Sequence, residues 1–309
     1  MSTSLTRRQA LVAAAAAPVA ASFLPGTALA AAPLQGPSSP RLSTRVVLGG
    51  YEVTALLSGT RTVENPKEIF GLNAGDAAFD AASEAAFLPT DKAQFFFTPT
   101  LVNTGSELIL FDTGVSAQGI VAALADAGVT PDQIDTVVLT HMHGDHIGGL
   151  MGEAGPTFAN ARYVTGAAEH NHWSGANNEG FQKNVVPLND RMTFLDDGGA
   201  VAPGVTAMLT AGHTPGHMGY MIESDGNQLM LIGDVANHPI WSVQNPDWEV
   251  RFDADKAAAA ATRRRVFGML AADRVPFIGY HMPFPALGYV AAEGDGFRYV
   301  PASYQMMLG

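Results

Sequence analysis

Three histidines and an aspartate crowd into residues 140–149, and their spacing suits a metal site. The apolar run 137–139 comes directly before them and predicts a short buried strand, so the cluster stands where a strand ends. His141 and His143 are two residues apart, so in an extended segment both imidazoles project to one side and can share an ion. An exposed polar turn is the alternative, but it offers no reason for this spacing. We therefore expect a metal centre at this strand end.

Further candidate ligands follow the same order of strand, turn and polar side chain. The full set is His141, His143, Asp145, His146, His213, Asp234 and His281. Seven groups are too many for one tetrahedral zinc ion and suit two ions that share a bridge. Asp234 is the natural bridge, because a carboxylate has two oxygens and a Gly-Asp turn presents both. Two divalent ions are thus expected as cofactors, Zn²⁺ first and Mn²⁺, Co²⁺ or Fe²⁺ as alternatives, since histidine and carboxylate accept all of them. Asp145 and Asp234 are the carboxylates expected to take part in catalysis.

Composition narrows the class of protein. The chain has 309 residues, of which 47% are hydrophobic and 15% charged, so one large domain of mixed α/β type is expected. The formal net charge of −12 argues against a nucleic-acid partner and against an anionic membrane surface, because both attract basic patches. There is no cysteine, so any metal must be held by histidine and carboxylate. A soluble enzyme acting on a small neutral substrate fits these bounds.

The N-terminus predicts export. Arg7 and Arg8 precede the alanine-rich apolar run 10–23, and residues 28–30 form a cleavage site of the A-x-A kind. The paired arginines are typical of a twin-arginine signal, with an ordinary secretory signal as the alternative. We expect a periplasmic or secreted bacterial protein without a membrane anchor once the signal is removed. The sequence leaves the oligomeric state open, and a homodimer is one possibility. The expected organisation is an export signal at 1–30, a flexible lead-in at 31–44 and a single domain at 45–309.

Strands and helices must position the ligands. Apolar runs predict strands at 46–48, 51–57, 95–102, 107–111, 137–139, 162–165, 205–209, 219–224, 228–232 and 277–280, and helices at 117–127, 167–173 and 254–272. The segment 61–91 lacks clear periodicity and predicts either a lid or rim beside the site or a pair of surface helices. Arg263, Arg264 and Arg265 are expected on a solvated helix face, because the chain shows no other basic patch.

The ordered set of Asp112-Thr113-Gly114, the cluster 141–146, His213, Gly233-Asp234 and His281 resembles the metallo-β-lactamase superfamily. The resemblance implies a four-layer αβ/βα sandwich with the metals at one edge between two sheets. It implies that His141, His143 and His213 hold one ion, that Asp145, His146 and His281 hold the other, and that Asp234 bridges them. By the same resemblance Asp112 accepts a hydrogen bond from a ligand imidazole and fixes its tautomer.

Three other stretches, 100–105, 281–285 and 293–301, are similar to methyl parathion hydrolase and its esterase and lactonase relatives. That subgroup implies a binuclear hydrolase in which a metal-bridging hydroxide attacks lactones, aryl esters or organophosphate triesters, and the N-terminal signal adds the expectation that the enzyme is exported. Trp173 and Phe181 are expected to wall the substrate pocket, with ordinary packing as the alternative. Asn237 is a third substrate-binding candidate, because it stands where the acyl-homoserine lactone lactonases have a tyrosine.

Other functions stay open at this point. A hydroxyacylglutathione-type thioesterase needs basic contacts for its anionic substrate, and the chain has only 17 Lys and Arg. True β-lactamases lack the bridging aspartate that Asp234 supplies. A metal-binding module without turnover is the alternative that is not an enzyme. It predicts bound metal and no hydrolysis.

Overall fold

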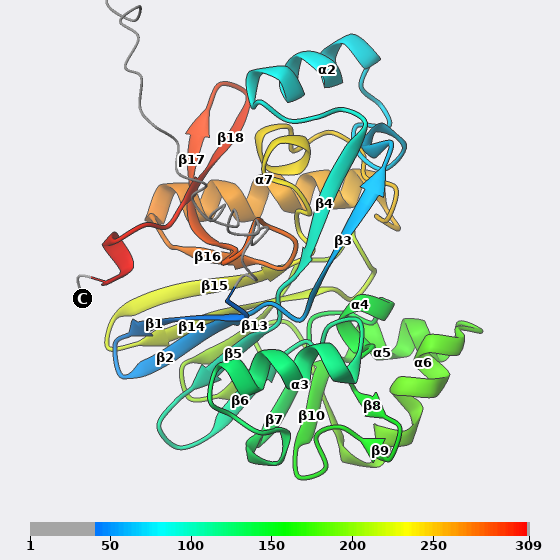
Figure 1. Cartoon of the computed structure of the whole chain (residues 1–309), viewed down its shortest axis with the longest axis vertical. Coiled ribbons are helices and arrows are strands. Elements are labelled where there is room, and N and C mark those ends of the chain that lie inside the picture. The colour runs from blue at the N-terminus through cyan, green and yellow to red at the C-terminus, as the bar shows by residue number, and fades with distance from the viewer. Residues whose placement is uncertain (1–40, 308–309) are drawn as a thin grey trace, which may run out of the picture. The chain divides into compact units, whose positions relative to one another are not determined.

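Two seven-stranded sheets form the middle of the molecule (Figure 1). The computed structural model describes residues 41–307, so the predicted export signal at 1–30 lies outside the described residues. The first sheet has the order β1 (Ser43–Leu48), β2 (Tyr51–Leu56), β5 (Thr100–Asn103), β6 (Leu108–Phe111), β7 (Thr136–Leu139), β10 (Arg162–Gly166) and β11 (Met192–Leu195). The second has the order β12 (Ala200–Ala202), β13 (Val205–Leu209), β14 (Met218–Ser224), β15 (Asn227–Gly233), β16 (Phe277–Gly279), β17 (Leu287–Glu293) and β18 (Gly296–Pro301).

Helices cover the outer faces of both sheets. On the first sheet these are α3 (Ala117–Asp126), α5 (Ala167–Ser174) and α6 (Glu179–Asn184), and on the second it is α7 (Lys256–Asp273). Side chains alternate across β7 with a period of two. Val138 packs in the cluster between the sheets with Tyr220, while Val137 packs in the cluster under α3 with Leu124. The expected αβ/βα sandwich is confirmed.

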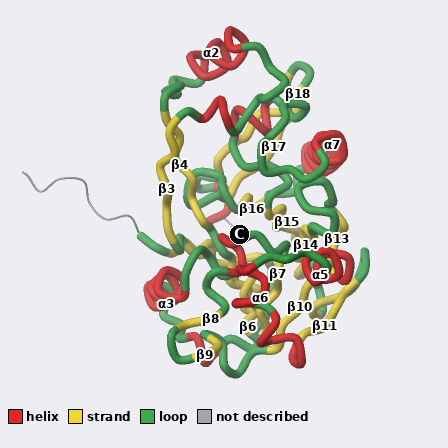
Figure 2. Tube along the Cα trace, turned by 90° about the vertical axis from the view of Figure 1, so that its right-hand side faces the viewer, coloured by secondary structure: helices red, strands yellow, loops and turns green. Residues whose placement is uncertain are grey.

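A two-stranded arm rises beyond the sheets and ends in a helix (Figure 2). It consists of β3 (Gly59–Glu64) and β4 (Lys92–Phe97), which pair antiparallel, and α2 (Asp76–Ala85) at its far end. The segment 61–91 is therefore part of this arm and not a pair of helices on the sheet, and its residues Arg61 and Val63 lie at the rim of a pocket. A buried aromatic cluster holds the arm, with Phe79 stacked on Trp241 at a centroid distance of 5.0 Å.

Three further sequence predictions need correction. The strand expected at 95–102 is two strands, because Pro99 has no amide proton and the chain passes from β4 to β5 there. Arg263 does not lie on a solvated face: its side chain is 0% exposed and paired with Asp253. β1 also begins at Ser43, inside the expected lead-in.

The remaining elements are short. They are α4 (Gly144–Ile147), the hairpin of β8 (Met151–Gly152) and β9 (Gly155–Pro156), and single helical turns at Pro66–Glu68, Pro131–Gln133, Val186–Arg191, Pro239–Gln244 and Gln305–Met307. Within residues 41–307, no helix combines the length and the apolar character that crossing a bilayer requires.

Candidate metal centre

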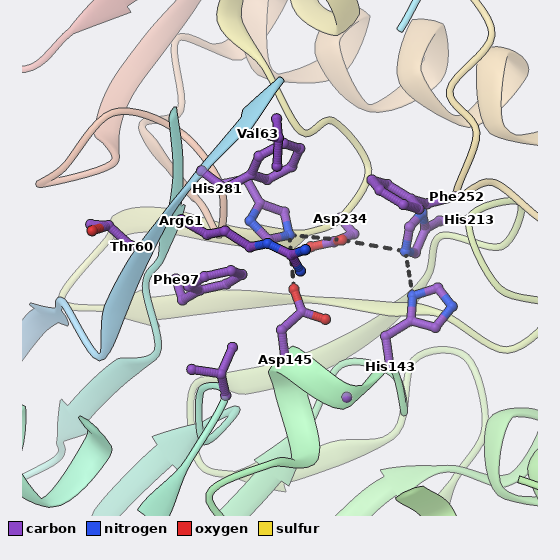
Figure 3. A pocket seen from close by; sticks show the side chains of 13 residues that line it. Thr60, Arg61, Val63, Phe97, His143, Asp145, His213, Asp234, Phe252 and His281 are labelled. Atoms are coloured by element: carbon purple, nitrogen blue, oxygen red, sulfur yellow. Dashed lines mark hydrogen bonds and ion pairs between the residues drawn. The ribbon is translucent and has the colours of Figure 1, made fainter. Parts of the chain in front are cut away.

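The seven candidate ligands come together where strands of both sheets end. β15 and β16 pair in parallel, so their carboxyl ends lie at one edge and bring Asp234 close to His281. β7 ends at the loop that carries His141 and His143 and runs into α4. His213 stands in the loop between β13 and β14. Figure 3 shows the side chains of these loops pointing toward one another.

Three histidines form the first group. Nδ1 of His143 lies 3.0 Å from Nε2 of His141 and 2.9 Å from Nε2 of His213. Each neutral imidazole has one nitrogen lone pair, so a shared cation can satisfy all three at once. We call His141, His143 and His213 the three-histidine group. Its donors are those that zinc prefers.

Asp145, His146 and His281 form the second group. Nε2 of His281 lies 3.4 Å from Oδ2 of Asp145, and Nε2 of His146 lies 3.8 Å from the same oxygen. The ligand atoms of this group lie within 4.8 Å of one another, as do those of the three-histidine group. We call these residues the mixed group.

The Asp234 carboxylate lies between the two groups (Figure 3). Its Oδ2 is 3.3 Å from Nε2 of His213 and 3.1 Å from Nε2 of His281, while its Oδ1 is 3.2 Å from Nε2 of His146. Among the described residues, Asp234 Oδ1 and His146 Nε2 are buried and have no hydrogen-bond partner. Two buried polar atoms left unpaired and facing each other fit a bound cation.

A carboxylate behind each group orients one of its imidazoles. Nδ1 of His146 lies 2.8 Å from Oδ2 of Asp112, whose carboxylate also accepts hydrogen bonds from the backbone and hydroxyl of Thr140. Nδ1 of His213 lies 3.0 Å from Oδ1 of Asp253. Each carboxylate favours the tautomer whose Nε2 lone pair faces the centre.

Sequence reasoning missed Asp253, because it stands in the loop before α7, outside any motif. Its Oδ2 accepts a hydrogen bond of 2.9 Å from the buried guanidinium of Arg263. His217, which the sequence leaves either at the surface or behind the ligands, accepts at its Nε2 a hydrogen bond of 3.0 Å from the backbone N–H of Asp234. The Gly-His pattern that singled out His213 could not indicate either residue.

The histidines of the two groups differ in their pKa values, because burial and the neighbouring charges act on them differently. Burial is the first cause that lowers the pKa of His141 well below its ordinary value, and burial with the neighbouring histidines lowers the pKa of His143 to about 4. Burial also opposes protonation of His146, but carboxylates around it, Asp234 first, raise its pKa well above the ordinary value. The pKa of His281 is raised in the same way. His141 and His143 are therefore ready to bind a cation at neutral pH, whereas His146 and His281 must first lose protons.

A cavity of about 740 Å³ opens in front of the two groups. Its apolar wall comes from the arm and two neighbouring loops, and it also contains one guanidinium, that of Arg61 (Figure 3). The apolar residues are Val63, Phe95, Phe97, Val115 and Phe252. The arm, which the sequence left as an irregular segment, thus supplies much of the pocket.

The three expected substrate contacts lie elsewhere. Phe181 is buried in the core under the first sheet, because α6 turns its apolar side chain inward. Trp173 donates a hydrogen bond of 2.6 Å to Glu169 and packs edge-on against His143, so it supports the three-histidine group from outside the pocket. Asn237 is buried, and its Nδ2 donates a hydrogen bond of 2.9 Å to Oδ2 of Asp234.

Comparison with known proteins agrees with this geometry. An N-acyl homoserine lactonase of Bacillus sp. is 26% identical over 144 residues, which are 47% of this chain and 55% of that protein. The chain therefore spans about half the length of the curated relatives it matches. Among solved structures, AidC, a dizinc quorum-quenching lactonase, is 26% identical with a TM-score of 0.77, and the match covers 86% of this chain and 100% of that one. The hydrolase AbOPH shares the fold, with 24% identity, a TM-score of 0.80, and 87% of this chain and 100% of that one covered. The family model of the metallo-beta-lactamase superfamily matches residues 98–277, and the chain belongs to that superfamily.

Proposed function

We propose that the chain is a metal-dependent hydrolase with a centre for two divalent ions, and that it acts on lactones and aryl esters of neutral, apolar acids. The observation that carries the proposal is the Asp234 carboxylate, whose Oδ2 lies close to His213 of one group and to His281 of the other, while its Oδ1 faces His146. When bound, two such ions lower the pKa of a water between them and polarise the substrate's carbonyl oxygen. The likeness to N-acyl homoserine lactonases and to a dizinc lactonase supports the lactone assignment.

The chain's own residues keep this centre in order. Asn237 donates to Oδ2 of Asp234 and holds the carboxylate between the two groups of ligands. Asp112 and Asp253 hold the imidazoles of His146 and His213 with their Nε2 atoms toward the centre. Such support matters because a metal ligand that can rotate loses affinity for its ion.

Asp145 is the group we assign to proton transfer at the leaving oxygen. It lines the cavity and its side chain is 28% exposed, so a substrate can reach it. The nearest phenol, that of Tyr280, is buried and donates its hydrogen bond to the backbone oxygen of Asp145. Asn237 is buried behind Asp234 and has no acidic proton at neutral pH. The Asp145 carboxylate can accept the proton that the attacking water loses and pass it to the leaving oxygen.

The pocket supports a neutral, apolar substrate. Phe95, Phe97 and Phe252 offer ring surface for an acyl chain or an aryl group. The Arg61 guanidinium can donate a hydrogen bond to a carbonyl or a phosphoryl oxygen. Phosphotriesters with good leaving groups are therefore alternative substrates, which we propose are hydrolysed more slowly than lactones and aryl esters. Export by a twin-arginine signal stays part of the proposal and rests on the sequence of residues 1–30 alone.

Elemental analysis beside a hydrolysis panel tests the proposal. The purified protein should hold two ions per chain and hydrolyse lactones and aryl esters faster than phosphotriesters, penicillins or thioesters of glutathione. Asp234→Ala should lose one ion and nearly all activity, because the carboxylate that faces both groups is gone. One ion per chain in fully active protein would overturn the two-ion centre. Bound metal without hydrolysis of any class would instead indicate a binding module.

A further inference from the structure

Glu169 is a buried carboxylate that the proposed chemistry does not use. It lies in the first turn of α5, and its side chain is 0% exposed. Its Oε1 accepts hydrogen bonds from the backbone of Met142 at 3.0 Å and from Nε1 of Trp173 at 2.6 Å. Its Oε2 accepts from Oγ1 of Thr214 at 2.7 Å and from the backbone of Gly216 at 3.1 Å. All four donors are neutral, and within residues 41–307 no Lys, Arg or His forms an ion pair with Glu169.

Three of the four donors come from the loops that carry the three-histidine group, and the fourth, Trp173, lies in α5 with Glu169. Met142 lies between His141 and His143 in sequence, and Thr214 directly follows His213. Two separate loops, 141–143 and 213–217, therefore meet on one carboxylate. Trp173 adds a third contact, because its ring packs edge-on against His143 at a centroid distance of 5.6 Å.

The second loop is pressed closely against α5. A Cβ at Gly216 would lie 2.0 Å from the backbone nitrogen of Glu169, so no larger residue fits there without moving the loop. No hydrogen bond joins Glu169 to Asp145, His146 or His281, the mixed group, in the part of the chain that the structure describes. The carboxylate thus contacts the surroundings of one group of ligands and not of the other.

We propose that Glu169 is a positioning residue that holds the two loops of the three-histidine group in register and thereby sets the affinity of that group for its ion. The inference rests on the proposed metal centre and adds a specific role to a residue outside it. A carboxylate buried without a cation is costly unless every oxygen is hydrogen-bonded, so the four donors and Glu169 keep one another in place.

The test is a Glu169→Gln variant, which keeps the shape of the side chain. The amide NH₂ cannot accept a hydrogen bond, so the donors of one loop lose their acceptor. We expect the affinity of the three-histidine group for Co²⁺ to fall about 10–100-fold, the range for loss of a group that orients metal ligands. The mixed group should stay within about threefold of the wild type, because Glu169 touches none of its residues.

The measurement is titration of metal-free protein with Co²⁺, followed by its visible absorption and by competition with a chromophoric chelator. A His213→Ala variant identifies the binding step that belongs to the three-histidine group. Thr214→Val removes one hydrogen bond to Glu169 and should weaken the same step. Thr214→Ser keeps the hydroxyl and should restore it, which a merely structural loss of packing would not do.

Ser83→Ala is the matched control for loss of stability. Ser83 is buried, and its hydroxyl bonds to the Phe79 carbonyl and to Nε1 of Trp241 in the arm, away from both ligand loops. It should lower the Tm and leave both Co²⁺ steps unchanged. If Glu169→Gln lowers the Tm but keeps both affinities, the inference is wrong and Glu169 is only structural. If Glu169→Gln does not fold, the Thr214 pair decides. If the wild-type protein binds no Co²⁺, the proposed function fails instead.

Discussion

Arg263→Met should destabilise the protein far more than the same change at either neighbouring arginine. The guanidinium of Arg263 is fully buried and donates three hydrogen bonds. Their lengths are 2.9 Å to Oδ2 of Asp253, 2.7 Å to the carbonyl oxygen of Pro246 and 3.2 Å to the carbonyl oxygen of Trp248. Methionine keeps most of the apolar stem but leaves the Asp253 carboxylate buried without its cation. Breaking one partner of a buried ion pair costs about 3–5 kcal/mol.

That cost is large enough to measure without ambiguity. At about 2–4 °C per kcal/mol for a domain of this size class, the Tm should fall by about 6–20 °C. Thermal unfolding of the metal-free protein, followed by circular dichroism, isolates this effect from metal binding. The effect should extend to the centre, because the other oxygen of Asp253 faces Nδ1 of His213.

Arg264→Met is the matched control. The Arg264 side chain is 45% exposed and pairs with Asp247, which is 58% exposed. Exposed pairs of this kind contribute about 0–1 kcal/mol, so the Tm of Arg264→Met should change by no more than about 4 °C. Equal Tm losses in the two variants would refute the reasoning, because they would place Arg263 on the solvated face that the sequence suggested.

Three further predictions concern the centre, the pocket and export. When metal-free protein is loaded with metal at neutral pH, protons should be released mainly as the mixed group fills. The reason is that the pKa values of His146 and His281 are raised, whereas that of His143 is lowered to about 4. The metal affinity of the mixed group should therefore rise with pH, and a pH-indicator dye in weak buffer detects the released protons. Phe97→Ala should lower kcat/KM for aryl esters by about 10–100-fold, since a buried aromatic contact contributes ~1.5–3 kcal/mol, whereas Phe181→Leu, in the core, should change stability rather than specificity. Arg7→Lys combined with Arg8→Lys should leave folded precursor in the cytoplasm if the signal is of the twin-arginine type. Cell fractionation, with the protein detected by an antibody, measures this. Continued export of the variant would indicate an ordinary secretory signal.

Local pattern was enough to predict most of the elements. Short apolar runs predicted β7 and β15, and the apolar run 117–127 predicted α3, because these signals depend on neighbours in sequence. The arm was not predictable in this way. Its strands β3 and β4 are separated by more than 25 residues in the sequence. The arm is stabilised by the stacking of Phe79 on Trp241, and neither residue belongs to β3 or β4.

The candidate ligands could be named from sequence because each stands in a short, local context. Asp145, His213 and Asp234 directly follow a glycine, and the other ligands stand at or near the end of a predicted strand. Their grouping around Asp234 depends on the parallel pairing of β15 with β16 and on the meeting of two sheets, which only the tertiary structure decides. The same holds for the residues behind the ligands. No sequence motif marks Asp253, Arg263 or Glu169. These charged residues can support the metal centre because they are buried, and a residue's type alone does not reveal its burial.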